Sequence, residues 1–223
     1  MLDWVREYQP LLTLVVSTCT LLVWLFYAHL LLANFKRQRR PNLIINRGAG
    51  KGLTSLCLIS NMSAEPMFIN QVLICLDTNR GSLLGDVTDI RESQEDEATP
   101  DLALYQTTHQ GPLRSGDFTH IGSFQALLRR AAEQHGIDLR GHQPEGEWQF
   151  LGMEIRVVAF YGSDRHPLGV SRRFTLDGAE LLPDSPLTRQ LCTRRERRQV
   201  RAWMVEHVGQ AGGDIAAPAG RPA

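Results

Sequence analysis

The chain has 223 residues, with 24 Lys and Arg against 24 Asp and Glu, so its formal net charge at pH 7 is +0. This balance lacks the basic excess of a typical nucleic-acid-binding domain, so we do not expect a nucleic-acid partner. The four cysteines are far apart in the sequence and form no CxxC or CxxH pattern, so they give no signal of a zinc site.

An apolar segment covers residues 11–35, after a short N-terminal segment of residues 1–10. It contains no Asp, Glu, Lys or Arg. As a helix its roughly 25 residues extend about 37 Å, enough to cross a hydrocarbon core of about 30 Å. We therefore predict a single transmembrane helix. A buried core helix is usually shorter, and a signal peptide would need a small-residue cleavage site, which the end of the segment, Ala33 to Lys36, does not offer.

The charges on either side of this helix predict its orientation. Arg6 is the one Lys or Arg before it, whereas a basic linker at residues 36–41 follows it. Because Lys and Arg near a span are retained in the cytoplasm, we expect a cytoplasmic C-terminal domain and an external N-terminus. If this charge rule failed, the domain would face the cell envelope. The basic linker residues are Lys36, Arg37, Arg39 and Arg40.

Residues 42–183 predict a mainly β domain, because short apolar runs with period-two alternation are separated by turn residues. One helix is expected inside it, with Ser123 as N-cap and Gly136 at its end. This pattern is similar to an immunoglobulin-like antiparallel β-sandwich, although the Cys-Trp-Cys hallmark is absent, so the similarity concerns architecture alone. The predicted strands are residues 43–45, 53–62, 67–76, 148–161 and 169–176.

Three patterns that suggest chemistry have simpler interpretations. In Gly48-Ala49-Gly50-Lys51-Gly52 the lysine is followed by glycine and then by a predicted strand, so we expect a glycine-rich turn instead of a phosphate loop. The acidic segment at residues 85–101 lacks the ligand spacing of a calcium loop. The stretch 83–90 at its start is compatible with a strand, whereas residues 92–101 predict a solvated loop. The histidines show no HxH or HExxH spacing. We therefore predict no catalytic residue, no cofactor and no metal site.

A basic amphipathic helix is predicted at residues 184–208, with Ser185 as N-cap and Pro186 at the first helical position. The Gly-, Ala- and Pro-rich tail at residues 209–223 predicts disorder. The helix could dock on the β domain with its arginines solvated or paired with the acidic loop, lie on an anionic membrane, or bind a macromolecule. The candidate contact residues for membrane or partner are the linker residues named above together with Arg194, Arg195, Arg197, Arg198, Arg201 and Trp203.

These features together favour a membrane-anchored, non-catalytic accessory or scaffold protein. It would present its β-sandwich to a protein partner at the bilayer, with anionic lipid headgroups as a further contact. Two alternatives stay open: a membrane-bound enzyme with an unrecognised site, and a binding domain that faces the envelope.

Overall fold

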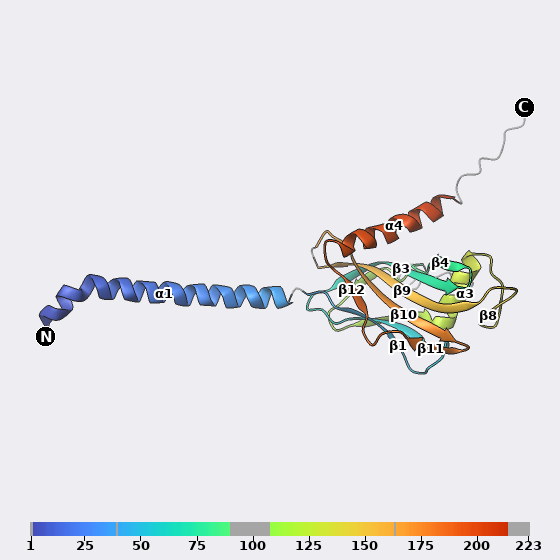
Figure 1. The fold of residues 1–223 in the computed structure, drawn as a ribbon, viewed down its shortest axis with the longest axis horizontal. Helices are drawn as coiled ribbons and strands as arrows, with labels where there is room; N and C mark the ends of the chain where they lie inside the picture. Colours follow the sequence, from blue (N-terminus) through green and yellow to red (C-terminus); the bar gives the residue numbers. More distant parts are fainter. Residues whose placement is uncertain (1, 39, 90–107, 163, 214–223) are drawn as a thin grey trace, which may run out of the picture. The chain divides into compact units, whose positions relative to one another are not determined.

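The computed structural model describes residues 2–38, 40–89, 108–162 and 164–213; for residues 2–7, 34–38 and 206–213 it describes the backbone only. The chain divides into two units, Met1–Arg40 and Pro41–Ala223. The fold is mixed α/β with mostly strands: a long apolar N-terminal helix, then antiparallel sheets with two shorter helices (Figure 1).

The first unit is the helix α1, Leu2–Gln38. Its segment Tyr8–Ala33, of 26 residues, is long and apolar enough to cross a membrane. The hydroxyls of Thr13, Thr18 and Thr20 each donate to the carbonyl four residues earlier at 2.8 Å, so these polar groups are satisfied within the helix. The predicted apolar helix is confirmed. Its length and composition suit a single membrane span and a signal sequence alike, and they leave its orientation open.

The second unit contains a three-stranded and a seven-stranded antiparallel sheet. The three-stranded sheet has the order β1-β2-β6, and the main path of the other is β11-β10-β9-β3-β4, with β12 beside β10 and β5 beside β3. The strands are β1 Leu43–Arg47, β2 Leu56–Asn61, β3 Met67–Thr78, β4 Gly81–Asp86, β5 Gly111–Leu113, β6 Phe118–Ser123, β9 Phe150–Tyr161, β10 Leu168–Asp177, β11 Glu180–Pro183 and β12 Arg189–Leu191, with a small hairpin of β7 Leu139–Arg140 and β8 Gln143–Pro144.

One hydrophobic core contains residues from both sheets and from α3, Phe124–Gln134. The predicted α3 is confirmed, because the Ser123 side chain accepts from the Ala126 amide and Gly136 takes a positive φ of 65° just beyond the helix. Phe124 packs edge-on against Phe174 of β10, with ring centroids 4.9 Å apart. The helix thus joins the core formed by the two sheets.

Side chains cap the terminal strand β1. The Gln190 amide donates to the Leu43 carbonyl at 2.5 Å, and the Leu43 amide donates back to Gln190 Oε1 at 3.4 Å. The Ile45 amide donates to Thr188 Oγ1 at 3.0 Å, and the Ile45 carbonyl accepts from Arg172 at 2.6 Å. These side chains replace a neighbouring strand, so this edge of β1 is closed to further pairing.

The terminal strand β4 is capped in the same way from the end of α3. The Asp86 amide donates to Gln134 Oε1 at 2.9 Å, and Gln134 Nε2 donates to the Asp86 carbonyl at 2.6 Å. A ring nitrogen of His135 lies 2.9 Å from the Leu84 carbonyl. The helix therefore both fills the core and closes a sheet edge.

The prediction of one helix from Ser185 is wrong. Arg189–Leu191 forms β12, which pairs with β10 and buries Leu191, and the second short helix, α4, is Glu196–Gly213. Its start is set by a capping box: the Glu196 amide donates to Thr193 Oγ1 at 3.3 Å, and the Thr193 amide donates to the Glu196 carboxylate at 3.0 Å. α4 extends to Gly213, five residues into the tail whose composition predicts disorder.

Some predictions lie outside the described residues, namely the acidic loop from residue 90 to residue 101 and the tail from residue 214. The glycine-rich turn at residues 48–52 is confirmed, since Gly50 has a φ of 100° and β2 follows instead of a helix. Cys57 of β2 and Cys75 of β3 are both buried.

The cap on β1 leads to a first testable prediction. Gln190→Met keeps the length of the side chain but leaves the Leu43 amide and carbonyl unpaired, so we expect the free energy of unfolding to fall by about 1–2 kcal/mol. Denaturant unfolding of the full chain in detergent, followed by tryptophan fluorescence, measures this change. Arg189→Met, at the exposed neighbouring position, is the control; equal stability of the two variants would contradict the cap.

Candidate functional site

The first half of α4 packs on the outer face of the seven-stranded sheet. Val200 and Trp203, which are 0% and 4% exposed, form a second apolar cluster with Leu73 and Val158. Gly169 of β10 lies directly beneath the helix, because a Cβ atom at that position would come within 2.6 Å of Val200 Cγ2. A glycine is therefore needed for this close approach. Leu191 of β12 completes the cluster.

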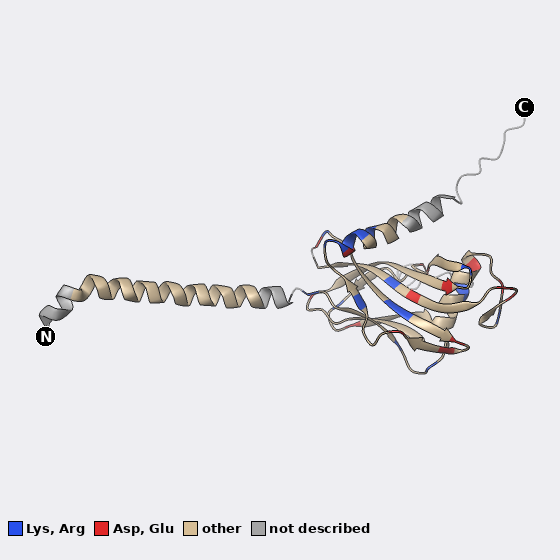
Figure 2. Cartoon of the chain, in the orientation of Figure 1, with Lys and Arg blue, Asp and Glu red and all other residues tan. Residues whose placement is uncertain are grey.

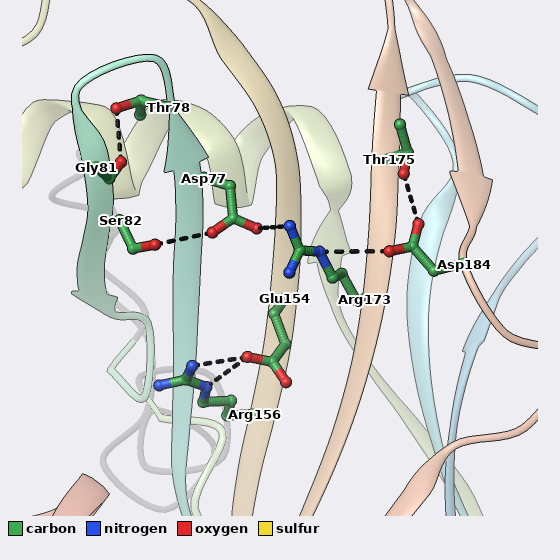
Figure 3. A network of polar contacts seen from close by, with 9 residues as sticks. All are labelled: Asp77, Thr78, Gly81, Ser82, Glu154, Arg156, Arg173, Thr175 and Asp184. Carbon is green, nitrogen blue, oxygen red and sulfur yellow. Dashed lines mark hydrogen bonds and ion pairs between the residues drawn. The ribbon is translucent and has the colours of Figure 1, made fainter.

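Charged residues continue this face of the sheet beyond α4 (Figure 3). Arg173 of β10 forms ion pairs with Asp77 of β3 at 2.9 Å and with Asp184 at 3.3 Å. Asp77 also accepts from the Ser82 hydroxyl at 2.9 Å, and Asp184 accepts from the Thr175 hydroxyl at 2.5 Å. The network joins β3, β4, β10 and the segment after β11. Because these groups are bonded to one another, the network stabilises the register of the strands and is poorly suited to binding a ligand.

A second ion pair lies beside this network and contacts α4. Arg156 of β9 pairs with Glu154 at 2.7 Å, and both side chains are about one-fifth exposed. The Arg156 guanidinium also lies over the Trp203 ring, 5.0 Å from its centroid. Arg156 therefore contacts both a charged side chain of this face and the helix α4 that covers the rest of it.

The structure divides the candidate contact residues of α4 into two groups. Arg197 and Trp203 are used inside the unit: Arg197 pairs with Asp164 at 3.0 Å and donates to the Cys192 carbonyl at 2.9 Å, and Trp203 is buried. The remaining four are exposed, and the described structure gives them no ion pair. Figure 2 shows Lys and Arg positions in blue at the start of α4. These four, called the arginine stripe below, are Arg194, Arg195, Arg198 and Arg201.

The linker candidates belong to the other unit. Lys36 and Arg37 are part of α1, and Arg40 is exposed. The side chains of Lys36 and Arg37, and the whole of Arg39, lie outside the described residues.

The outer face of the three-stranded sheet carries apolar side chains among uncharged polar ones, which the sequence analysis did not predict. Register places Ile44, Ser60 and Phe118 in one cross-strand row, and Asn46, Leu58 and His120 in the next. Phe118 is 68% exposed. The rows contain no Lys, Arg, Asp or Glu. With the alternating neighbours on β2 and just after it, the apolar residues of this face, called the apolar face below, are Ile44, Leu56, Leu58, Met62 and Phe118.

Period-two alternation could have revealed this face. Cys57, Ile59 and Asn61 are the buried residues of β2, so Leu56, Leu58 and Met62 occupy the positions that should be polar if the outer face were simply solvated. The sequence of β2 is apolar on both faces. That pattern is typical of a strand covered on two sides.

A cavity of about 350 Å³ lies near the β7–β8 hairpin. Its walls include the apolar side chains of Leu53, Leu128 and Phe150, and its titratable lining residues are His142 and Asp177. Among the described residues no hydrogen bond or ion pair joins these two groups, and no group of three His, Cys, Asp or Glu could hold a metal ion. The cavity therefore gives no acid–base pair to which a reaction can be assigned.

Several titratable groups are shifted by burial. Burial raises the pKa of the Cys57, Cys75 and Cys192 thiols, so these groups stay protonated and weakly nucleophilic near neutral pH. Burial, with the nearby Arg130 as a further cause, lowers the pKa of His109 to about 4, so this imidazole is neutral near pH 7. These shifts are those of buried structural groups.

No family model, no curated protein and no solved structure matches this chain.

The packing of α4 against the seven-stranded sheet leads to a second prediction. Gly169→Val should push α4 off the sheet, and Trp203→Ala should release it by removing its largest buried side chain, at a cost of about 3 kcal/mol. Either change should raise the rate of tryptic cleavage after Arg198 and Arg201 by roughly 100-fold, because cleavage requires local opening.

Leu187→Ala, at a position that is 76% exposed, should leave that rate unchanged. If the cleavage rates of all three variants equal that of the unmodified chain, α4 is not held by this cluster.

Proposed function

We propose that this chain is a membrane-anchored accessory protein that binds a protein partner through the apolar face of its second unit. The helix Tyr8–Ala33 supplies the anchor, since its described side chains are all exposed and a helix of this length and composition is stable in lipid. We interpret the second unit as an immunoglobulin-like sandwich, because one core contains residues of both sheets. The charge difference across the helix supports a cytoplasmic second unit.

The apolar face is the observation that carries this proposal. A solvated antiparallel sheet normally shows polar residues on its outer side, whereas this one shows isoleucine, leucine and phenylalanine on its three strands and a methionine just after β2. Aromatic residues and methionine are enriched in the cores of protein–protein interfaces, and charged residues are depleted there. A lipid surface is a poorer fit, because the two rows lack the Lys and Arg that anionic headgroups attract.

The chemistry of the other surfaces favours binding over catalysis. The face under α4 is filled by packed side chains, and its charges pair with one another. Burial raises the pKa of the Cys57, Cys75 and Cys192 thiols, and among the described residues no hydrogen bond or ion pair joins His142 to Asp177 in their shared cavity. The apolar face, by contrast, has exposed apolar surface that a protein partner can bury.

A third prediction concerns orientation. In a Cys192→Ser background, Ala179→Cys places a thiol at an exposed position of the second unit, while Cys57 and Cys75 are buried. We expect a membrane-impermeant maleimide to label this cysteine only after the membrane is opened. Labelling in intact cells would place the unit on the outside and overturn the cytoplasmic part of the proposal, while the anchor itself would stand.

A fourth prediction concerns the partner. A photoreactive residue in place of Ser60, at the centre of the apolar face, should form a discrete adduct with one protein in native membranes. Phe118→Asp in the same chain should weaken this contact by at least about 30-fold, because a charge would replace a central apolar contact. Leu187→Asp, at an exposed apolar position outside the face, is the control.

Three results would count against this partner site: no adduct, an adduct with a second copy of the chain, or equal loss of the adduct in the two Asp variants. Far-ultraviolet circular dichroism of both variants excludes misfolding as the cause of any loss.

A further inference from the structure

The arginine stripe is a surface that the proposed protein contact does not use. In Figure 1, α4 and β1 lie on opposite sides of the second unit, so the stripe and the apolar face are separate surfaces. We propose that the arginine stripe binds the anionic phosphate headgroups of the bilayer and holds α4 against the membrane surface. This inference rests on the membrane anchor of the proposed function.

Helical spacing places the stripe on the side of α4 that faces away from the sheet. Val200 and Trp203 point inward and are buried. Arg198 and Arg201 are three residues apart and exposed, and Val205, four residues further, is 69% exposed. Residues three and four apart are neighbours on a helix, so these side chains form one continuous outward strip. An arginine-rich strip that ends in an apolar side chain suits the boundary between headgroups and acyl chains.

The internal partners of α4 leave the stripe available. Arg197, whose position is between two stripe residues, already binds Asp164 and the Cys192 carbonyl. The Glu196 carboxylate, the one acidic group in the first turn, is held by Thr193, and these hydrogen bonds lower its pKa. The described structure thus pairs Arg197 and Glu196 with specific groups and shows the four stripe arginines exposed.

The position of the stripe at the start of α4 strengthens its attraction for anions. The capping box makes Thr193 the N-cap, so Arg194 and Arg195 occupy the first turn. The free backbone amides of a helix start carry partial positive charge, and cations there are unfavourable for the isolated helix. An external anion relieves that repulsion. Phosphate headgroups, which accept paired hydrogen bonds from guanidinium groups, are suitable anions.

Chain connectivity brings the stripe to the side of the second unit where the chain enters it. Leu43, two residues after Pro41, exchanges hydrogen bonds with Gln190, and Arg194 follows Gln190 by four residues. A segment of four residues spans at most about 14 Å. Arg194, the first residue of the stripe, is thus close to the point at which the chain enters the β unit. Each cation near an anionic surface strengthens its attachment about fivefold.

The test uses the full chain in vesicles. Val205→Cys, in a Cys19→Ser and Cys192→Ser background, carries an environment-sensitive fluorophore next to the stripe. The vesicles are phosphatidylcholine alone or with about 30% phosphatidylglycerol, and each contains a lipid with a quencher on its headgroup. Flotation of the protein with the vesicles is scored first, because it tests the anchor separately.

We expect strong quenching in the anionic vesicles and weak quenching in the neutral ones. Raising the salt concentration from about 0.1 M to about 1 M should abolish the difference, because the screening length falls from about 10 Å to about 3 Å. Arg198→Gln with Arg201→Gln should weaken docking by about 30-fold. Arg114→Gln with Arg129→Gln removes the same charge from exposed arginines elsewhere and should leave docking unchanged.

Each contrary result has a defined meaning. Equal quenching in both lipids, or equal effects of the two arginine pairs, overturns the lipid assignment. Absence of quenching, together with an adduct from position 205 to an acidic protein that the Arg198 and Arg201 changes abolish, assigns the stripe to a protein instead. Failure of flotation overturns the proposed anchor, whereas flotation without quenching overturns this inference alone.

Discussion

The junction between β1 and the segment Thr188–Gln190 is the interaction on which the rest of the second unit depends. Gln190 and Thr188 satisfy the backbone of Leu43 and Ile45, although they are 147 and 143 residues away in the sequence. Arg172 joins the same junction through the Ile45 carbonyl and lies over the Phe174 ring, 5.6 Å from its centroid. Burial, with the nearby charge of Arg47, lowers the pKa of Arg172, so the junction contains a partly desolvated cation stabilised by carbonyl groups. It joins the strand at which the chain enters the unit to β10 and to the segment that leads into β12.

This junction also explains which part of the fold could be predicted from the sequence. The strands around Val72 and Val157 were predictable because period-two alternation depends on local burial, and α3 because its cap and glycine stop are local signals. The start of the last helix was not predictable in this way. Ser185-Pro186 has the residue types of a helix N-terminus, and the four-residue spacing of Leu187 and Leu191 matches one apolar face of a helix. Leu187 is in fact exposed, and Leu191 is buried through pairing with β10. The local signal that should have been preferred is Thr193-x-x-Glu196.

The candidate surfaces were predictable to different degrees for the same reason. The arginines of α4 were visible because a cluster of charges needs no tertiary information, yet only the structure separates Arg197, which is bound inside the unit, from Arg198, which is exposed. Alternation marks the apolar outer positions of β2, but the extension of the apolar face across β1 and β6 required their register, since Ile44 and Phe118 are 74 residues apart in sequence and meet in one row through Ser60. Long-range pairing of this kind is not encoded in any short window of residues.

The two proposed contacts differ in physical chemistry, and this difference separates their ligands. The apolar face gains free energy by losing water, at about 25 cal/mol per Å² of apolar area buried, which salt does not weaken. The arginine stripe gains by Coulomb attraction, which is screened within about 10 Å at 0.1 M salt. Because the two surfaces lie on opposite sides of the unit, a single ligand would have to reach around the unit to bind both. If α4 lies on the membrane, the apolar face is turned away from the lipid and toward the aqueous phase, where a protein partner can cover it.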